Sequence, residues 1–157
     1  MKRIVLTIAL MAMALCSFAQ GGSKRSIATL QATDNSYYQV FSFDDAEGTR
    51  GYYLGLGAAE NSSKETFVLL GSNVNDAASS LKAIQALFDA PVGDTREYKA
   101  KMGGKLPEGA LLSCKVKVEG KKQLCFTAGS LNTRIQKSSV KTLLKFLSSY
   151  QKRHPDK

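Results

Sequence analysis

The segment TFVLLGSNVNDAASSLKAIQALFDAPVG, residues 66–93, decides the fold class because the spacing of its apolar residues changes within it. Residues 66–71 form a short apolar run, which predicts a strand. From Ala77 onward the apolar residues recur at helical intervals and predict an amphipathic helix over about 76–89. A strand that leads directly into a helix in a chain of 157 residues indicates a domain built from both kinds of element.

Strands are also expected on the N-terminal side of this segment. Residues 27–33 and 37–43 alternate in character and are rich in Tyr, Val, Ile and Phe, so they predict a hairpin that turns at Asp34 and Asn35. A third strand is predicted over 52–58, after a polar loop. Neighbouring strands joined by short turns pair antiparallel.

The C-terminal part of the chain follows the same order. Residues 96–102 predict a strand, and 110–118 with 122–128 predict a hairpin. The last helix is expected over about 137–152, where apolar residues again follow helical spacing. The predicted fold is therefore α+β, a mostly antiparallel sheet with two amphipathic helices packed on one face.

The two predicted helices are similar to each other in sequence. Residues 79–88 align without a gap on 138–147, and each segment follows a strand that ends in Gly-Ser. One interpretation is an internal duplication with βββα-like halves at 27–90 and 95–153. The alternative is that any two amphipathic helices that follow strands resemble each other.

Residues 1–19 predict a cleavable secretory signal peptide. A positively charged start precedes an apolar run over 4–16, which is too short to cross a bilayer comfortably as a mature helix. The small residues Ser17 and Ala19 place the cut after Ala19. We therefore expect an exported chain.

Three parts follow the predicted cut. Residues 20–26 are expected to be a flexible N-terminus, 27–153 a single α+β domain, and 154–157 a polar tail. A second apolar run of spanning length does not follow, so the mature chain is expected to be soluble in the periplasm or outside the cell.

The chain is basic, with 22 Lys and Arg against 13 Asp and Glu and a formal net charge of +9. This excess favours anionic partners. Nucleic-acid binding would combine the cations with aromatic residues on one surface, but the Tyr and Phe residues concentrate between 37 and 67. We therefore expect a protein, an anionic glycan or a lipid headgroup as the partner, with Lys141 and Lys145 of the last helix as candidate contacts.

Tyrosines on neighbouring predicted strands provide a second candidate surface. Tyr37 and Tyr38 belong to the second strand, and Tyr52 and Tyr53 to the third. Because each has an apolar body and one polar end, they are suited to the margin of a ligand or partner groove. The alternative is that they fill the core and pair across strands.

Cys114 and Cys125 remain after the signal is removed and are a candidate disulfide, since exported proteins meet oxidising conditions. A two-residue turn at 119–120 would place the two cysteines opposite each other on one face. A three-residue turn at 119–121 would instead pair Cys114 with Phe126 and send Cys125 to the other face. The second register gives the better apolar face and is preferred.

Few residues offer catalytic chemistry. His154 is the one histidine of the sequence and lies in the polar tail, which argues against Ser-His-Asp, Cys-His and histidine-zinc sites. Asp44, Asp45 and Glu47 cluster in one loop and are the residues that a small carboxylate-based hydrolase would use. A solvated turn is the simpler interpretation of that cluster, and the chain is expected to be no enzyme and to hold no cofactor or metal.

Gly55 and Gly57 lie inside the third predicted strand and not between a strand and a helix, so they do not form a phosphate-binding turn. With Tyr53 they share one face of the strand, where they would leave room for a helix to approach closely. Leu54 and Leu56 face the other way.

The signal that ends in Phe18-Ala19, with Gln20 at the new N-terminus, and the short strand-and-helix domain behind it resemble the small uncharacterised secreted proteins of the Bacteroidota. The resemblance implies a Gram-negative periplasm or the cell exterior and carries no functional residues. The function we expect is that of an exported, non-enzymatic binding module for a protein or an anionic ligand. The alternative is a structural or assembly component of an envelope complex that contacts its partners through the last helix or an exposed strand edge.

Overall fold

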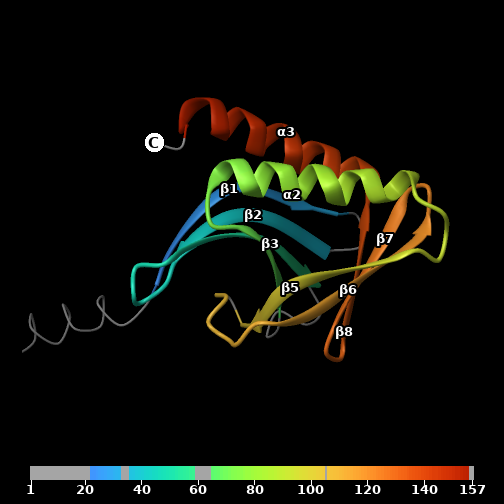
Figure 1. Cartoon of the computed structure of the whole chain (residues 1–157), viewed down its shortest axis with the longest axis horizontal. Coiled ribbons are helices and arrows are strands. Elements are labelled where there is room, and N and C mark those ends of the chain that lie inside the picture. Colours follow the sequence, from blue (N-terminus) through green and yellow to red (C-terminus); the bar gives the residue numbers. More distant parts are fainter. Residues whose placement is uncertain (1–21, 33–35, 59–64, 105, 156–157) are drawn as a thin grey trace, which may run out of the picture.

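The structure is a computed structural model that describes residues 22–32, 36–58, 65–104 and 106–155 (Figure 1). The predicted signal peptide and the predicted turn at Asp34 and Asn35 lie outside the described residues. Within them, the predicted α+β class is confirmed, because eight strands form one antiparallel sheet and two helices pack against it.

The strands follow one another in the sheet in the order in which they occur in the chain, and every neighbouring pair is antiparallel. In chain order the elements are β1 (Ser23–Gln31), β2 (Ser36–Asp44), β3 (Arg50–Ala58), β4 (Glu65–Gly71), α2 (Val74–Ala86), a 3₁₀ turn (Leu87–Asp89), β5 (Thr95–Gly103), β6 (Leu112–Gly120), β7 (Gln123–Ala128), β8 (Leu131–Gln136) and α3 (Lys137–Arg153).

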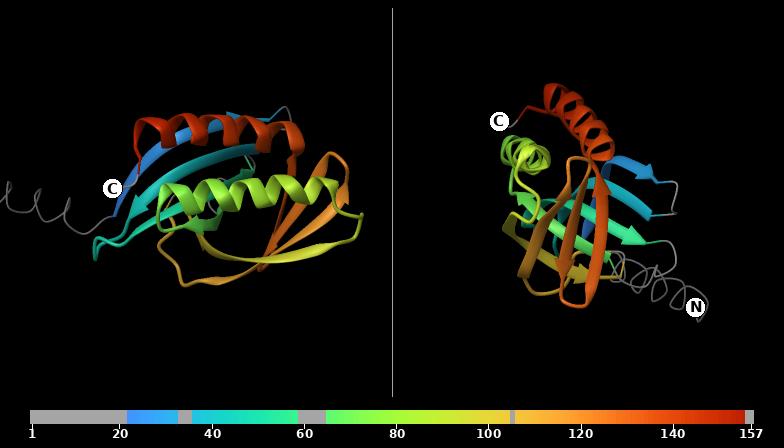
Figure 2. Two further views of the ribbon diagram at one scale, coloured as in Figure 1. Left: turned by 45° about the horizontal axis from the view of Figure 1, so that its top comes forward. Right: turned by 90° about the vertical axis from the view of Figure 1, so that its right-hand side faces the viewer.

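Both helices cover the same face of the sheet, which we call the inner face (Figures 1 and 2). Side chains alternate along each strand, so every second residue points toward the helices. Buried apolar residues at these positions form the main core: Val40, Leu54, Val68, Val116, Phe126 and Ile135. The opposite side of the sheet is the outer face.

The helix predicted over 76–89 begins slightly earlier, at Val74, and ends in the 3₁₀ turn at 87–89. Asn73 caps its start, because its side-chain oxygen accepts a 2.8 Å hydrogen bond from the backbone N–H of Asp76. The apolar stripe that predicted this helix is buried against the sheet and against α3. The last helix covers the predicted range and ends at Arg153.

The sheet is strongly curved, so that strands far apart in its order approach each other (Figure 2). β4 and β5 pair along only the four residue pairs from Glu65–Gly103 to Val68–Ala100, and the first and second halves of the sheet turn relative to each other at this point. As a result β8 contacts β3, and the hydroxyl of Tyr38 in β2 donates a 2.7 Å hydrogen bond to the carbonyl oxygen of Arg134 in β8.

The sequence pattern did not predict β8. Its inward positions are Leu131, Thr133 and Ile135, and the residues between them are polar, which makes the alternating signal short and weak. Gly129, with a φ of 56°, provides the left-handed backbone of the tight turn into this strand. Each half of the chain therefore contains four strands followed by a helix, and not three.

The turn between β6 and β7 falls at Lys121 and Lys122, later than either predicted register. Cys114 lies opposite Ala128, and Cys125 lies opposite Lys117. The two cysteines consequently occupy opposite faces of the sheet, as the preferred register predicted. Both are buried free thiols.

Candidate functional site

Two adjoining cavities lie where the first turn of α3 meets β8, β7 and the end of β1. Gln136 and Ser138 line both cavities. We call the two cavities together the α3-start cleft. Two backbone features hold its elements in place: Gln136 pairs with Gln123 in the β7–β8 ladder, and the N–H of Lys137 donates a 3.0 Å hydrogen bond to the carbonyl of Lys122.

The smaller cavity has a volume of about 290 Å³ and is lined mainly by uncharged polar side chains. Tyr38 closes one side, and its hydroxyl is engaged by the carbonyl of Arg134. The polar groups around it come from β1, β7, β8 and α3: Gln31, Gln123, Arg134, Gln136, Ser138 and Ser139.

The larger cavity has a volume of about 430 Å³, and lysines dominate its lining. Lys122 comes from the β6–β7 turn, while Lys137 and Lys141 lie one helical turn apart on α3. The first turn of α3 contains no acidic residue, and the side chain of Gln136 does not cap it. Negative charge at this end of the helix would be favoured by the peptide dipoles.

Two of the cations around the cleft already have carboxylate partners. Lys137 contacts Asp89 at 3.0 Å, and Arg134 contacts Glu119 at 2.8 Å. The hydrogen bond that Arg134 donates to Glu119 raises the pKa of Arg134 further above its ordinary value. Within the described part of the chain, Lys122 and Lys141 make no ion pair. These two ammonium groups are therefore the ones available to an anion.

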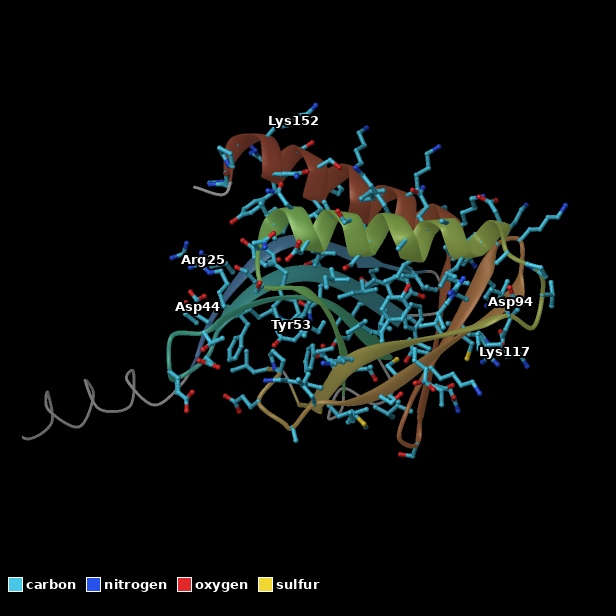
Figure 3. The ribbon with its side chains drawn as sticks, viewed as in Figure 1. Arg25, Asp44, Tyr53, Asp94, Lys117 and Lys152 are labelled. Carbon is cyan, nitrogen blue, oxygen red and sulfur yellow. The ribbon has the colours of Figure 1, made fainter. Side chains whose placement is uncertain are left out.

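Of the two predicted lysines, one lines the cleft and the other does not. Lys141 lines the larger cavity. Lys145 is exposed one turn further along α3 and lines neither cavity. Lys152, near the far end of the helix, points away from the sheet (Figure 3).

The four predicted tyrosines do not lie on one surface. Tyr38 and Tyr52 point to the inner face and belong to the main core. Tyr37 and Tyr53 point to the outer face, where Tyr53 is seen on the side of the sheet away from the helices (Figure 3). Only Tyr38 borders the α3-start cleft.

The outer face of β2, β3 and β4 carries a second, smaller core. Phe41 stacks on Tyr53 with ring centroids 5.7 Å apart and meets Phe67 edge to face at the same separation. Phe43 belongs to the same cluster, and Leu106 packs against it. The main core on the inner face and this aromatic cluster on the outer face explain why strands β2 and β3 carry buried apolar residues on both faces.

Next to this cluster lies a buried polar network centred on Glu65. Its carboxylate accepts hydrogen bonds from the hydroxyl of Tyr37 and from Nε2 of Gln39, the latter at 3.1 Å. Lys24 donates to Oε1 of Gln39 at 2.7 Å and lies over the ring of Phe41. Burial, together with Glu65, raises the pKa of Tyr37 above its ordinary value, and burial lowers that of Lys24.

Gly55 and Gly57 also face the outer side of the sheet, so neither α2 nor α3 packs on them. A Cβ on Gly55 would lie 2.7 Å from Cγ of Gln39, and a Cβ on Gly57 would overlap the ring of Tyr37. The prediction that these glycines admit a helix was therefore wrong. They admit the cross-strand side chains of the polar network instead.

The three acidic residues of the loop differ in their partners. Asp44 forms a two-bond ion pair with Arg50, with distances of 2.6 and 2.9 Å, and this hydrogen bonding lowers the pKa of the carboxyl group. Oδ1 of Asp45 accepts hydrogen bonds from the backbone N–H groups of Glu47 and Thr49 and thereby shapes the turn. Glu47 itself is exposed.

The chain has no match among the known proteins with which it can be compared. No protein-family model matches the chain, and no curated protein or solved structure is similar enough to be counted as a match. Among the residues that the structure describes, no cluster of His, Cys, Asp and Glu could hold a metal ion, and no helix is both long and apolar enough to span a bilayer.

Proposed function

We propose that this chain is an exported, non-enzymatic binding module that recognises an anionic ligand at the α3-start cleft. One observation carries the proposal: each charged side chain described as lining the two cavities is a cation. These cations are Lys122, Arg134, Lys137 and Lys141.

The charge and the concave shape of the cleft act together. Cations that line a concave surface raise the local concentration of anions and speed their association. Lys122 and Lys141, which make no ion pair within the described residues, can donate charge-assisted hydrogen bonds, which are about twice as strong as bonds between neutral groups. Arg134 and Lys137 are held in place by Glu119 and Asp89, which balance their charge. The ammonium, amide and hydroxyl groups that line the cleft are suited to bind an anion. Most proton transfers in catalysis would instead need a carboxylate or an imidazole as the base.

Calorimetric titration of the purified protein with tripolyphosphate tests this proposal. The double variant Lys122→Gln/Lys141→Gln should bind at least about tenfold more weakly, because two charge-assisted contacts are lost. The matched control is Lys99→Gln/Lys115→Gln, which removes the same charge from exposed outer-face positions of β5 and β6. Equal weakening in both variants would reject the site.

The second proposal is a structural or assembly role in an envelope complex. It is supported by Phe146, whose side chain is 48% exposed on α3 beside Lys145. An exposed aromatic residue on a helix is a typical anchor for a protein partner. Crosslinking in the native envelope should give a defined adduct that Phe146→Ser abolishes, and a free monomer in both cases would reject this role.

We also propose that the domain arose by internal duplication. The support is that four strands and a helix follow one another twice, and that α2 and α3 pack side by side on the inner face. The two helices retain the aligned segments 79–88 and 138–147. Separate expression of the two halves, followed by a test for mutual association, would examine this origin.

A further inference from the structure

We infer that the ligand of the α3-start cleft is an anionic saccharide, whose hydroxyl groups contact the smaller cavity and whose acidic group contacts the lysines of the larger one. This inference rests on the proposed function, because it names the class of anion that the same cleft takes.

The lining of the smaller cavity supplies the first argument. Three glutamine side chains, from β1, β7 and β8, come together there with two serine hydroxyls of α3. Each amide offers both a donor and an acceptor, and each hydroxyl can play either part. The vicinal hydroxyl groups of a sugar ring need this mixture of donors and acceptors. A bare inorganic anion accepts hydrogen bonds only and would leave the amide oxygens to water.

The connection between the two cavities supplies the second argument. Gln136 and Ser138 line both, so a ligand that contacts the amides extends directly toward Lys122 and Lys141. The cavity volumes of about 290 and 430 Å³ together reach the size range of small-molecule sites, about 300 to 1,000 Å³. A hydroxylated ring with a carboxylate or phosphate substituent matches this division into an amide part and a cationic part.

The surroundings of the cleft argue against a nucleic acid. Single-stranded nucleic acids stack their bases on exposed aromatic rings beside a cationic groove. The one aromatic residue at this cleft is Tyr38, among the described residues, and only 2% of its surface is exposed. Its hydroxyl is held by Arg134, so the ring cannot turn outward without breaking that bond.

Apart from Lys122, the groups that would contact the ligand are carried by regular elements. Gln123 and Gln136 face each other in the β7–β8 ladder, and Ser138 and Lys141 belong to one helix. The bond between Lys137 and Lys122 ties the helix to the β6–β7 turn. The backbone of a site held in this way loses little conformational freedom on binding, which favours recognition of a small polar ligand.

Calorimetric titration of the purified protein with three small probes tests the inference. Trigalacturonate carries both carboxylates and hydroxyls, tripolyphosphate carries charge alone, and maltotriose carries hydroxyls alone. Trigalacturonate should bind about tenfold more tightly than tripolyphosphate, as a few additional hydrogen bonds allow, and maltotriose should bind most weakly. If tripolyphosphate binds as tightly as trigalacturonate, the anion site stands and the saccharide is rejected. If neither anion binds, the proposed function itself fails.

Variants separate the two parts of the cleft. Gln123→Ala/Gln136→Ala should weaken trigalacturonate binding about tenfold and leave tripolyphosphate binding within about twofold. Gln85→Ala on α2 is the matched control, because this half-buried glutamine lines neither cavity. Gln31→Ala, at an exposed end of β1, gives a second test that does not depend on the β7–β8 ladder. Equal weakening for both anions would overturn the assignment of the amides to sugar hydroxyls.

Discussion

The hydroxyl of Tyr38 donates a 2.7 Å hydrogen bond to the main-chain carbonyl of Arg134, a residue 96 positions further along the chain. Tyr38 belongs to β2 and Arg134 to β8, which lie near opposite ends of the strand order. The bond therefore joins two parts of the sheet that do not pair with each other, and it lies in the wall of the smaller cavity. Curvature of the sheet and formation of the α3-start cleft are thus linked at one contact.

Removal of this hydroxyl should destabilise the protein. Tyr38→Phe leaves the carbonyl of Arg134 without its side-chain donor, and we expect the free energy of unfolding to fall by about 1 kcal/mol. Urea denaturation followed by circular dichroism measures the change. Tyr98→Phe in β5 is the control, since it removes a hydroxyl that bonds to no other described residue. An equal loss in the two variants would show that the contact between β2 and β8 contributes nothing of its own.

Replacing the buried Glu65 by alanine should destabilise the protein far more than replacing an exposed glutamate. Glu65 is 4% exposed and accepts hydrogen bonds from Tyr37 and Gln39, so Glu65→Ala leaves one half-buried and one buried donor unpaired. We expect a loss of about 2–4 kcal/mol in the free energy of unfolding. Glu97→Ala, at an exposed position of β5, should change it by less than about 0.5 kcal/mol. A small effect at Glu65 would mean that water or a rearranged Gln39 replaces the carboxylate.

Alanine at Gly55 should disturb the same network through its volume. The added methyl group would lie 2.7 Å from Cγ of Gln39, closer than nonbonded carbons approach. We expect Gly55→Ala to cost about 1–3 kcal/mol, measured by urea denaturation. Gly120→Ala is the control, because nothing lies within 4 Å of its added Cβ. If the two alanine variants were equally stable, Gln39 would have to move aside without loss.

Most elements of the fold could be predicted from the sequence because their apolar residues follow a clear period. The segment 66–93 already contains the strand, the helix and the break after it, and the structure departs from these ranges by only a few residues at the ends. The missed strand β8 is a polar edge strand, and its tight turn at Gly129 left too few alternating residues to identify it. Its position is determined by pairing with β7, which is a property of the folded sheet.

The candidate site was much less predictable. The position of Lys141 on the last helix predicts it as a contact, but Gln31, Gln123 and Gln136 lie in separate strands and form no spacing that a sequence pattern could reveal. They meet only because the sheet curves. The positions of the tyrosines follow a simpler rule, since adjacent residues of one strand point to opposite faces. Tyr37 and Tyr38 therefore could not both contribute to one surface of the sheet.

The thiol of Cys114 should make the stability of the protein depend on alkaline pH. Cys114 is fully buried on the inner face, and burial, with a smaller effect of Cys125, raises its pKa from 9.0 to about 11. In the unfolded chain the thiol loses its proton first, so the free energy of unfolding is unaffected below pH 9 and falls as the pH rises toward 11. At pH 10.5 we expect a loss of about 2 kcal/mol from this group.

Urea denaturation under reducing conditions at pH 8 and pH 10.5 measures this loss. Cys114→Ala should show a smaller decrease between the two pH values than the unmodified protein, even though its stability at pH 8 is lower. Burial also raises the pKa of Tyr37, Tyr53 and Tyr98, so both proteins share a further alkaline decrease that cancels in the comparison. Cys125→Ala retains the Cys114 thiol and should keep most of the pH dependence. If Cys114→Ala and the unmodified protein lose the same free energy, the buried thiol does not stay protonated at pH 10.5, and water must reach the inner face between β6 and the helices.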